Sequence, residues 1–182
     1  MACSPTLYEG VRRPGREAFA AIFDEYHLGV CRYLCSLVDD AALAEDLAQQ
    51  AFVKAYRALT AGRAPENVRA WLFTIATRTA LSALRRRRVV AWLPLAPHRA
   101  APGAGGREEE GRLANRELLH QALRALPEPD AACLLLRFQQ GLSYDELARV
   151  LHTTVPAAKM RLSRARAAFR EAYLQLSQEV NR

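Results

Sequence analysis

Apolar residues recur along this chain at the spacing of an α-helix. Within residues 41–58, the apolar positions share one side when successive residues are placed 100° apart. These positions are Leu43, Leu47, Ala48, Ala51, Phe52 and Ala55. Stretches of alternating β-branched residues are missing, whereas Ala, Leu and Arg dominate the composition and favour helices. The pattern therefore predicts an all-α protein.

The helical pattern is interrupted in residues 85–111, RRRRVVAWLPLAPHRAAPGAGGREEEG. Its prolines and glycines disfavour a continuous helix. We therefore predict two small helical domains joined by a flexible linker, the C-terminal one a helix-turn-helix. The predicted divisions are an N-terminal tail 1–16, a first domain 17–88, a linker 89–111, a second domain 112–176 and a C-terminal tail 177–182.

The stretch LSYDEL predicts the start of a helix inside the second domain. Ser143 and Glu146 have the spacing of a capping box, and Leu142 and Leu147 have the spacing of a hydrophobic staple. Further helices are expected over 112–125 and 130–139. A short helix, a tight turn and a longer basic helix form the helix-turn-helix pattern.

The last predicted helix combines an apolar stripe with many cations. Thr153 or Thr154 caps it, and Pro156 falls in its first turn, where a missing N–H costs little. The stripe expected to face the domain's own core comprises Ala158, Leu162, Ala165, Phe169 and Ala172. The positions opposite or flanking the stripe are Pro156, Ala157, Lys159, Met160, Arg161, Arg164, Arg166 and Arg170.

Small residues at the tip of this helix and cations along both flanks suit the DNA major groove. Arg164 is the candidate for reading bases. The candidates for holding phosphates are Lys159, Arg166 and Arg170. The alternative is a solvated basic face on a surface helix, but the capped helix and short turn before it favour DNA binding.

Composition supports an anionic partner. The 182 residues carry a formal net charge of +7, and the isoelectric point is near 9.7. This charge favours nucleic acid over a membrane surface. No segment approaches the roughly 20 apolar residues needed to span a bilayer, and the N-terminal residues lack the apolar run of a signal peptide. Four cysteines without a paired framework fit a reducing cytoplasm, which is the predicted location.

A second basic helix is predicted over residues 66–88. Its buried side is expected to comprise Val68, Trp71, Leu72 and Ile75. Thr74, Arg78 and Arg85 form a polar stripe, and four consecutive arginines finish the helix. Arginines suit a helix C-terminus, but four in a row favour a second nucleic-acid contact. Trp71 and Phe73 are candidates for stacking on unpaired bases, although Trp71 is expected in the core.

The polar side of residues 41–58 contains one apolar residue. This side comprises Glu45, Asp46, Gln49, Gln50, Val53 and Arg57. An exposed valine among amides and acids indicates either a protein-docking surface or a scattered surface residue. The residues alone favour the second interpretation.

His27, Cys31 and Cys35 share a helix face and are residue types that bind zinc, but a fourth ligand is missing. Buried free cysteines are the expected reading, with no metal and no cofactor. No glycine-rich phosphate loop, nucleophile elbow or paired-His motif is present, so no catalytic residues are predicted and an enzyme is not expected. The alternative function is a two-domain helix-turn-helix regulator that binds operator DNA without polymerase.

The ordered motifs resemble those of the extracytoplasmic-function (ECF) sigma factors of the sigma-70 family. DDAALAEDLAQQAFVKAYR resembles that family's helix for docking on core RNA polymerase. VRAWLFTIATRTALSALRRRR resembles its helix for melting and reading the minus-ten promoter element. The segment from ALRALPEPD to RARAAFRE resembles its minus-thirty-five domain. The similarity covers about residues 17–173.

This resemblance implies a sigma factor for transcription initiation at a specialised set of promoters. The implied partners are core RNA polymerase, double-stranded promoter DNA, the unpaired minus-ten strand and an anti-sigma factor, without membrane insertion. Asp46, Gln49 and Phe52 match the docking motif of that family, and the resemblance therefore implies that the polar side of 41–58 is the polymerase contact. The implied minus-ten residues are Thr74, Arg78, Ser82, Arg85, Arg86 and Arg88. The linker segment VVAWLPLA is expected to enter the polymerase or to pack on the first domain.

Several positions depart from the family pattern. Gln50 replaces an acid of the docking motif, and Arg78 and Ser82 replace the usual Asn and Asp of the melting helix. His152 occupies the usual glycine position of the turn. Pro156, Ala157 and Met160 replace the common Gly, Thr and Ser of the reading helix. These changes leave the family role in place but not the promoter sequence.

Overall fold

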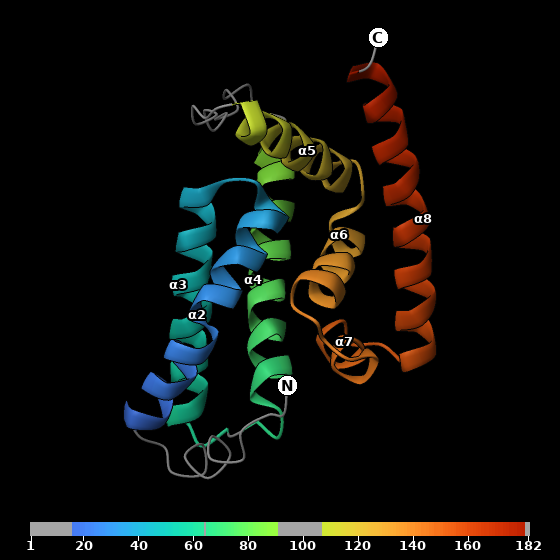
Figure 1. Cartoon of the computed structure of the whole chain (residues 1–182). Coiled ribbons are helices and arrows are strands. Elements are labelled where there is room, and N and C mark those ends of the chain that lie inside the picture. The colour runs from blue at the N-terminus through green and yellow to red at the C-terminus, as the bar shows by residue number, and fades with distance from the viewer. Residues whose placement is uncertain (1–15, 64, 91–106, 181–182) are drawn as a thin grey trace.

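The computed structural model describes residues 16–63, 65–90 and 107–180, and its secondary-structure elements are all helical (Figure 1). This confirms the predicted all-α class. The N-terminal helices are α2 (Arg16–Val38), α3 (Ala41–Thr60) and α4 (Val68–Val90). The C-terminal helices are α5 (Arg107–Arg124), α6 (Glu128–Leu134), the π-helix η1 (Leu135–Gln139), α7 (Tyr144–Val150) and α8 (Val155–Val180).

Helices α2, α3 and α4 pack into one bundle. Asp40 caps α3, because its Oδ1 accepts a hydrogen bond from the Leu43 N–H at 2.9 Å. The buried side of α3 matches the predicted stripe, except that Leu43 is half-buried and Ala44 and Leu59 are buried as well. The outer side of α3 is consequently free of core contacts.

Phe73, rather than Trp71, is the aromatic core residue of α4. Phe73 is 1% exposed, and its ring meets that of buried Tyr33 edge-on at 5.6 Å. Trp71 and Ile75 are half-buried and pack against the core, so they lie on the predicted side of α4 but are less covered than Val68 and Leu72. Stacking of Phe73 on bases is wrong, because its ring is buried. All of these residues are apolar, and only the packing of α2 determines which of them is covered.

The helix-turn-helix has the predicted start signals. Ser143 Oγ accepts from the Glu146 N–H at 3.2 Å, and Glu146 Oε2 accepts from the Ser143 N–H at 2.8 Å, which confirms the capping box. Leu142 and Leu147 are fully buried. Thr154 is the residue that caps α8, since its Oγ1 accepts from the Ala157 N–H at 3.3 Å.

Three local features were not predicted. Residues 135–139 form a π-helix rather than the end of an α-helix, with the Gln140 N–H donating to the Leu135 carbonyl at 3.0 Å. Helix α5 begins at Arg107, inside the segment predicted as linker, and α8 continues to Val180, inside the predicted C-terminal tail. VVAWLPLA lies almost wholly outside the described residues.

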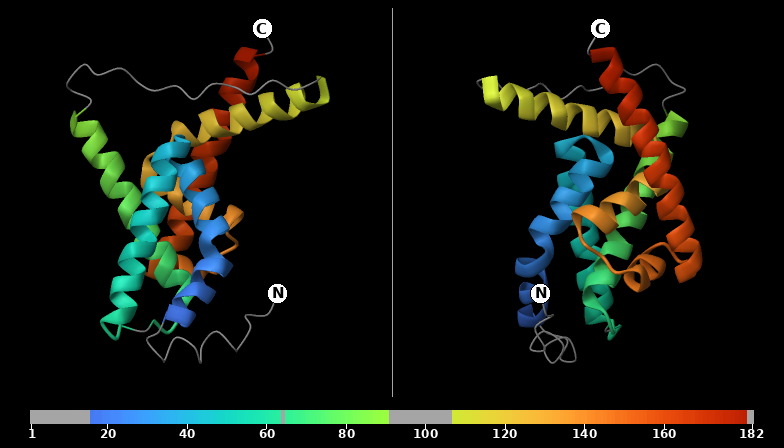
Figure 2. Two further views of the ribbon diagram at one scale, coloured as in Figure 1. Left: turned by 90° about the vertical axis from the view of Figure 1, so that its left-hand side faces the viewer. Right: turned by 45° about the vertical axis from the view of Figure 1, so that its right-hand side comes forward.

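The two groups of helices pack side by side, with α5 across one end (Figures 1 and 2). Their buried apolar residues form one continuous core, which includes Leu34 and Phe73 from the first group and Cys133 and Leu147 from the second. The contact places α7 against α4 and η1 against α2. The structure therefore joins two units that the sequence suggested only as tethered.

Candidate nucleic-acid and polymerase interfaces

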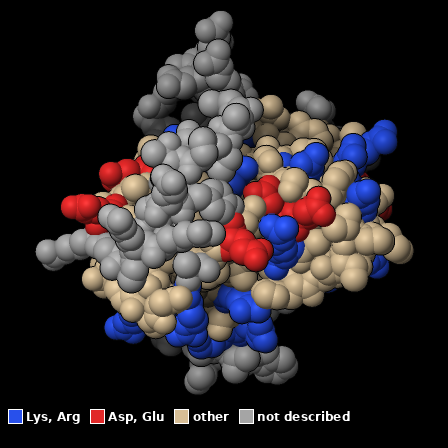
Figure 3. Space-filling model, turned by 90° about the horizontal axis from the view of Figure 1, so that it is seen from below, with Lys and Arg blue, Asp and Glu red and all other residues tan. Residues whose placement is uncertain are grey.

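Helix α8 buries the first three residues of its predicted stripe and exposes most of its predicted DNA face, whereas Phe169 and Ala172 of the stripe are only half-buried. Ala158, Leu162 and Ala165 are each at most 4% exposed. Met160 on the opposite side is 64% exposed. The other exposed residues of this face are Pro156, Ala157, Lys159 and Arg164. Figure 3 shows basic side chains along the right-hand edge of the molecule, on the side where α7 and α8 lie.

Lys159 and Arg161 are each held by a neighbour. Lys159 Nζ lies 5.2 Å from the centre of the Tyr144 ring, whose surroundings also include the Arg137 guanidinium at 4.7 Å. Arg161 Nε lies 3.5 Å from Asp130 Oδ1. Lys159 is thus exposed and oriented, whereas Arg161 is partly engaged inside its own domain.

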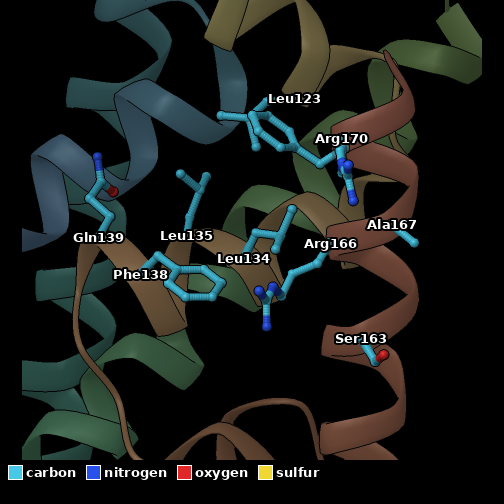
Figure 4. A pocket seen from close by; sticks show the side chains of 10 residues that line it. Leu123, Leu134, Leu135, Phe138, Gln139, Ser163, Arg166, Ala167 and Arg170 are labelled. Atoms are coloured by element: carbon cyan, nitrogen blue, oxygen red, sulfur yellow. The ribbon is translucent and has the colours of Figure 1, made fainter. Parts of the chain in front are cut away.

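Arg166 and Arg170 line an apolar hollow of about 590 Å³ between α8, η1 and α5. Arg166 extends from α8 toward Phe138, with its Cζ 5.8 Å from the ring centre (Figure 4). The other apolar lining includes Leu123, Leu134 and Leu135. Arg166 and Arg170 are therefore exposed and also line this hollow. Helix periodicity alone did not predict that they would lie beside an apolar hollow.

A second hollow, of about 520 Å³, lies between α3 and α4 and is strongly basic. It is lined by Lys54, Arg57, Ala58, Arg63, Trp71, Ile75, Arg78, Thr79 and Ser82. Lys54 Nζ donates to Thr79 Oγ1 at 2.9 Å, which holds the ammonium against α4. Four basic side chains therefore lie next to the half-buried indole of Trp71, an arrangement that can bind a phosphate and stack a base. The hollow brings Arg78 and Ser82 together with Arg57, which the sequence had assigned to polymerase docking.

Lys54 and Arg63 were missed as candidates. Lys54 lies in the predicted docking helix, and Arg63 lies in the connection after it. Nothing local in the sequence places either of them beside Arg78. The only sequence signal was their charge.

The remaining minus-ten candidates have different surroundings. Thr74 Oγ1 donates to the Ala70 carbonyl at 2.7 Å, so this hydroxyl is partly used within α4. Arg85 and Arg86 are exposed, and Arg86 Nη1 donates to Ser82 Oγ at 3.4 Å. The side chain of Arg88 lies outside the described residues.

The arginine run that ends α4 also has a structural role. Arg87 pairs with Asp40, the cap of α3, at 3.2 Å. One arginine of the run therefore links two helices of the bundle, a partnership that helix spacing alone did not suggest.

The outer face of α3 presents every residue predicted for polymerase docking. Glu45, Asp46, Gln49, Gln50, Val53 and Arg57 are all exposed. Val53 is 43% exposed and lies near Tyr56, which is 39% exposed and was not predicted. Phe52 is only 4% exposed and packs against Phe19 and Phe23, so it supports this face from within.

His27 Nε2 and Cys31 Sγ lie 3.5 Å apart on α2. Burial raises the pKa of both the Cys31 and the Cys35 thiol, which favours the protonated form. Among the residues that the structure describes, no three His, Cys, Asp or Glu side chains are grouped to hold a metal ion. Within the same residues, no helix has both the length and the apolar character needed to cross a membrane.

Two family models match the chain: sigma-70 region 2 over residues 22–89 and sigma-70 region 4 over residues 116–169. The RNA polymerase sigma-H factor of Pseudomonas aeruginosa is 31% identical over 189 residues, covering 96% of this chain and 95% of that protein. The ECF RNA polymerase sigma-E factor of Escherichia coli K12 is 29% identical, covering 89% of this chain and 90% of that protein.

Solved structures share the fold. CnrH, in complex with the cytosolic domain of CnrY, has a TM-score of 0.69 at 23% identity and covers 94% of this chain and 96% of its own. The sigma factor RpoE of Bartonella quintana, in complex with the anti-sigma factor NepR, has a TM-score of 0.64 at 25% identity and covers 85% of this chain and 95% of its own.

These similarities span nearly the whole chain, in the order that its motifs predicted. The chain belongs to the sigma-70 family, in its ECF group, and is an RNA polymerase sigma factor. Sigma factors are non-enzymatic regulators of transcription initiation.

Proposed function

We propose that the outer face of α3 docks this sigma factor on core RNA polymerase. Glu45, Asp46, Gln49, Gln50 and Val53 form the contact, and Tyr56 extends it. The support is that these side chains are exposed together on one helix whose opposite side is the core of the bundle. An exposed valine and tyrosine among polar residues are typical of a protein interface.

The basic hollow between α3 and α4 is proposed to hold the unpaired minus-ten strand. Lys54, Arg57, Arg63 and Arg78 neutralise phosphates, and Trp71 offers a partly exposed aromatic surface for a base. This convergence of four cations from two helices and their connection is the observation that carries the proposal. Thr74, Ser82, Arg85, Arg86 and Arg88 extend the contact along α4.

Helix α8 is proposed to read the minus-thirty-five element in the major groove. Pro156, Ala157 and Met160 lead the approach, and Arg164 reads base edges. The residues proposed for the flanking phosphates are Lys159, Arg161, Arg166 and Arg170. The proposed domains that make these two DNA contacts are 17–88 and 112–176, and the matches to sigma-70 regions 2 and 4 support this division.

The chain itself is proposed to carry no catalytic activity, because nucleotide addition belongs to the polymerase. It acts in the cytoplasm, where bacterial transcription takes place. An anti-sigma factor is a proposed partner, by analogy with the Bartonella quintana protein, whose structure contains one.

Transcription with purified core polymerase on a promoter library tests the whole proposal. RNA that depends on added sigma factor, from a subset of promoters sharing two elements, is the expected result. Arg78→Ala should reduce this RNA while leaving binding of core polymerase unchanged. A chain that binds neither core polymerase nor any promoter complex would contradict the proposal.

A further inference from the structure

The basic hollow between α3 and α4 contains cations that have no carboxylate partner. Lys54, Arg57, Arg63 and Arg78 form no ion pair with any residue that the structure describes. None of the nine residues that line the hollow is acidic. Positive charges that converge without a counter-charge repel one another, and an anion bound among them relieves this repulsion. The hollow therefore favours a ligand with several negative charges.

The α4 side of the hollow is one helix face with different chemistry at its two ends. Trp71, Arg78 and Ser82 lie seven and four residues apart, and both spacings return to the same side of an α-helix. Thr79 lies ~12 Å from Trp71 along the helix axis. Lys54 Nζ is held at this far end, because it donates to Thr79 Oγ1 at 2.9 Å. An aromatic group and a fixed ammonium group therefore lie at opposite ends of the same hollow.

The aromatic end can stack a planar ring. The Trp71 side chain is half-buried and packs against the core, while it also lines the hollow. An indole that is already held by the core loses little freedom when a base stacks on it. Stacking accepts any base, since every base has a π face. Ile75, on the same side of α4, adds apolar surface beside the indole.

The basic end has the donors that phosphate oxygens accept. An arginine can donate two parallel hydrogen bonds to one phosphate group, and a lysine acts on it as a compact charge. Arg78, Arg57 and Lys54 supply these groups from two helices. Ser82 Oγ accepts from Arg86 Nη1 at 3.4 Å, and the Ser82 O–H can donate to a ligand oxygen. The donors therefore suit more than one phosphate group.

The size of the hollow fits a small molecule that uses both ends. Its volume of about 520 Å³ lies within the range of roughly 300–1,000 Å³ that small-molecule sites occupy. A single inorganic phosphate would leave the indole unused. An uncharged aromatic ligand would leave the four cations without a counter-charge. A base linked to several phosphates satisfies the indole and the cations together.

We propose that this hollow binds a free nucleoside triphosphate, with its base on Trp71 and its phosphates among Lys54, Arg57 and Arg78. Arg63 adds positive charge from the connection after α3. Binding of the nucleotide does not depend on the minus-ten role of the hollow, but its consequence rests on that proposed function. The nucleotide and the unpaired strand need the same cations and the same indole. Free nucleotide therefore competes with the strand, in proportion to its concentration.

Quenching of Trp71 fluorescence by ATP tests the site directly. The sequence contains two tryptophans, so the full chain with Trp92→Phe keeps Trp71 as its single reporter. ATP added at low ionic strength should quench the emission saturably, because the adenine stacks on the indole. Inorganic tripolyphosphate should cause no quenching by itself and should reverse the quenching by ATP. Emission that ATP does not quench saturably, or quenching that tripolyphosphate does not reverse, would overturn the proposal.

Substitutions in the same Trp92→Phe chain distinguish the hollow from general positive charge. Arg78→Ala should weaken ATP binding at least about fivefold, since one charge-assisted contact to a phosphate is lost. Arg63→Ala should weaken it as well. Arg32→Ala removes the same charge from the exposed side of α2 and should keep the affinity within about twofold. All three side chains are exposed, and circular dichroism confirms that the variants fold. Equal losses for Arg32→Ala and Arg78→Ala would overturn the site.

Competition with a single strand tests the consequence of binding. ATP should displace a fluorescent DNA strand of about 20 nucleotides from the wild-type chain, with the half-saturation found by quenching. ATP that binds without displacing the strand would overturn the shared site.

The nucleotide site and the proposed function fail separately, because the fluorescence experiments need no polymerase. A chain that supports Arg78-dependent transcription with core polymerase but shows no quenching by ATP would sink the nucleotide site alone. A chain that binds ATP through Arg78, and whose Arg78→Ala variant transcribes normally, would sink the minus-ten role and support the nucleotide site.

Discussion

Asn67, which precedes and caps α4, donates a hydrogen bond from its Nδ2 to Glu146 Oε1 of α7 at 3.3 Å. The other carboxylate oxygen of Glu146 accepts from the Ser143 N–H within the capping box. Asn67 in turn caps α4, because its Oδ1 accepts from the Ala70 N–H at 2.8 Å. Two helix starts that are 79 residues apart in sequence therefore share one polar contact.

Glu146→Ala should destabilise the protein by about 1 kcal/mol, because α7 loses half of its capping box. Urea unfolding monitored by circular dichroism measures the change. Asp145→Ala, one residue earlier in the first turn of α7, is the control and should cost less, since the carboxylate of Asp145 is not part of the capping box. Equal losses in the two variants would show that the box contributes nothing.

Stability should fall in acid partly through Glu146. Partial burial raises the pKa of this carboxyl group, but hydrogen bonds from Ser143 and Asn67 and the charge of Arg69 lower it below its ordinary 4.5. Since the folded state binds the proton more weakly, the stabilisation is present above the unfolded pKa and is lost as pH falls through the folded one. Glu146→Gln should therefore show a shallower loss of unfolding free energy between pH 5 and 3, by urea titration at each pH. Identical pH profiles would contradict this.

His152→Gly should stabilise the protein by about 0.5–1 kcal/mol. His152 has a φ of 50°, a left-handed conformation that costs a side-chain-bearing residue about 1–2 kcal/mol, partly offset by the greater entropy of unfolded glycine. Thermal unfolding should shift upward by about 2 °C. The neighbouring Thr153→Gly, without a positive φ, should lower the transition instead. A fall in the transition temperature for His152→Gly would show that the imidazole contributes more than the backbone costs.

Val53 and Phe52 are adjacent in sequence, but their substitution should have different effects: one on polymerase binding and the other on stability. Val53→Asp changes an exposed side chain, so we expect stability within about 0.5 kcal/mol of the wild type and at least tenfold weaker binding to core polymerase. Phe52→Ala opens the core and should destabilise the fold by about 3–5 kcal/mol. Affinity is measured with labelled core enzyme, and unchanged affinity for Val53→Asp would remove this face from the interface.

Lys159→Ala should lower the salt dependence of duplex binding. Each phosphate contact contributes a slope of about 0.9 to the plot of log affinity against log salt, and Lys159 is exposed beside Tyr144. Fluorescence anisotropy at several salt concentrations gives the slope. Arg116→Ala, exposed on α5, should keep it. A slope that stays unchanged for Lys159→Ala would place this residue off the DNA.

Features that depend on neighbours in sequence were predictable. Ser143 and Glu146 could be paired from their spacing, because a capping box lies within one helical turn. The burial of Ala158, Leu162 and Ala165 of α8 followed from its periodicity, since one side of the helix had to meet the core. The exposed outer face of α3 followed in the same way, although its proposed docking role required the family resemblance.

Features that join distant segments could not be read in this way. Arg87 and Asp40 are 47 residues apart, and nothing near either residue identifies the other. Trp71 and Phe73 are both large aromatic residues of α4, so hydrophobicity could not distinguish which one lies under Tyr33. The π-helical turn after Leu134 is likewise a departure from regular helix that hydrophobic periodicity does not report.

The sequence by itself determined the all-α class, the capping box of α7, the buried side of α3 and the family, because each depends on local spacing or on motifs in order. Only the tertiary structure decided that Lys54, Arg57, Arg63 and Arg78 line one hollow and that Asn67 contacts Glu146. Such arrangements depend on how whole helices pack. The packing energy comes from many weak contacts between residues that are distant in sequence, so it cannot be inferred from any short stretch of sequence.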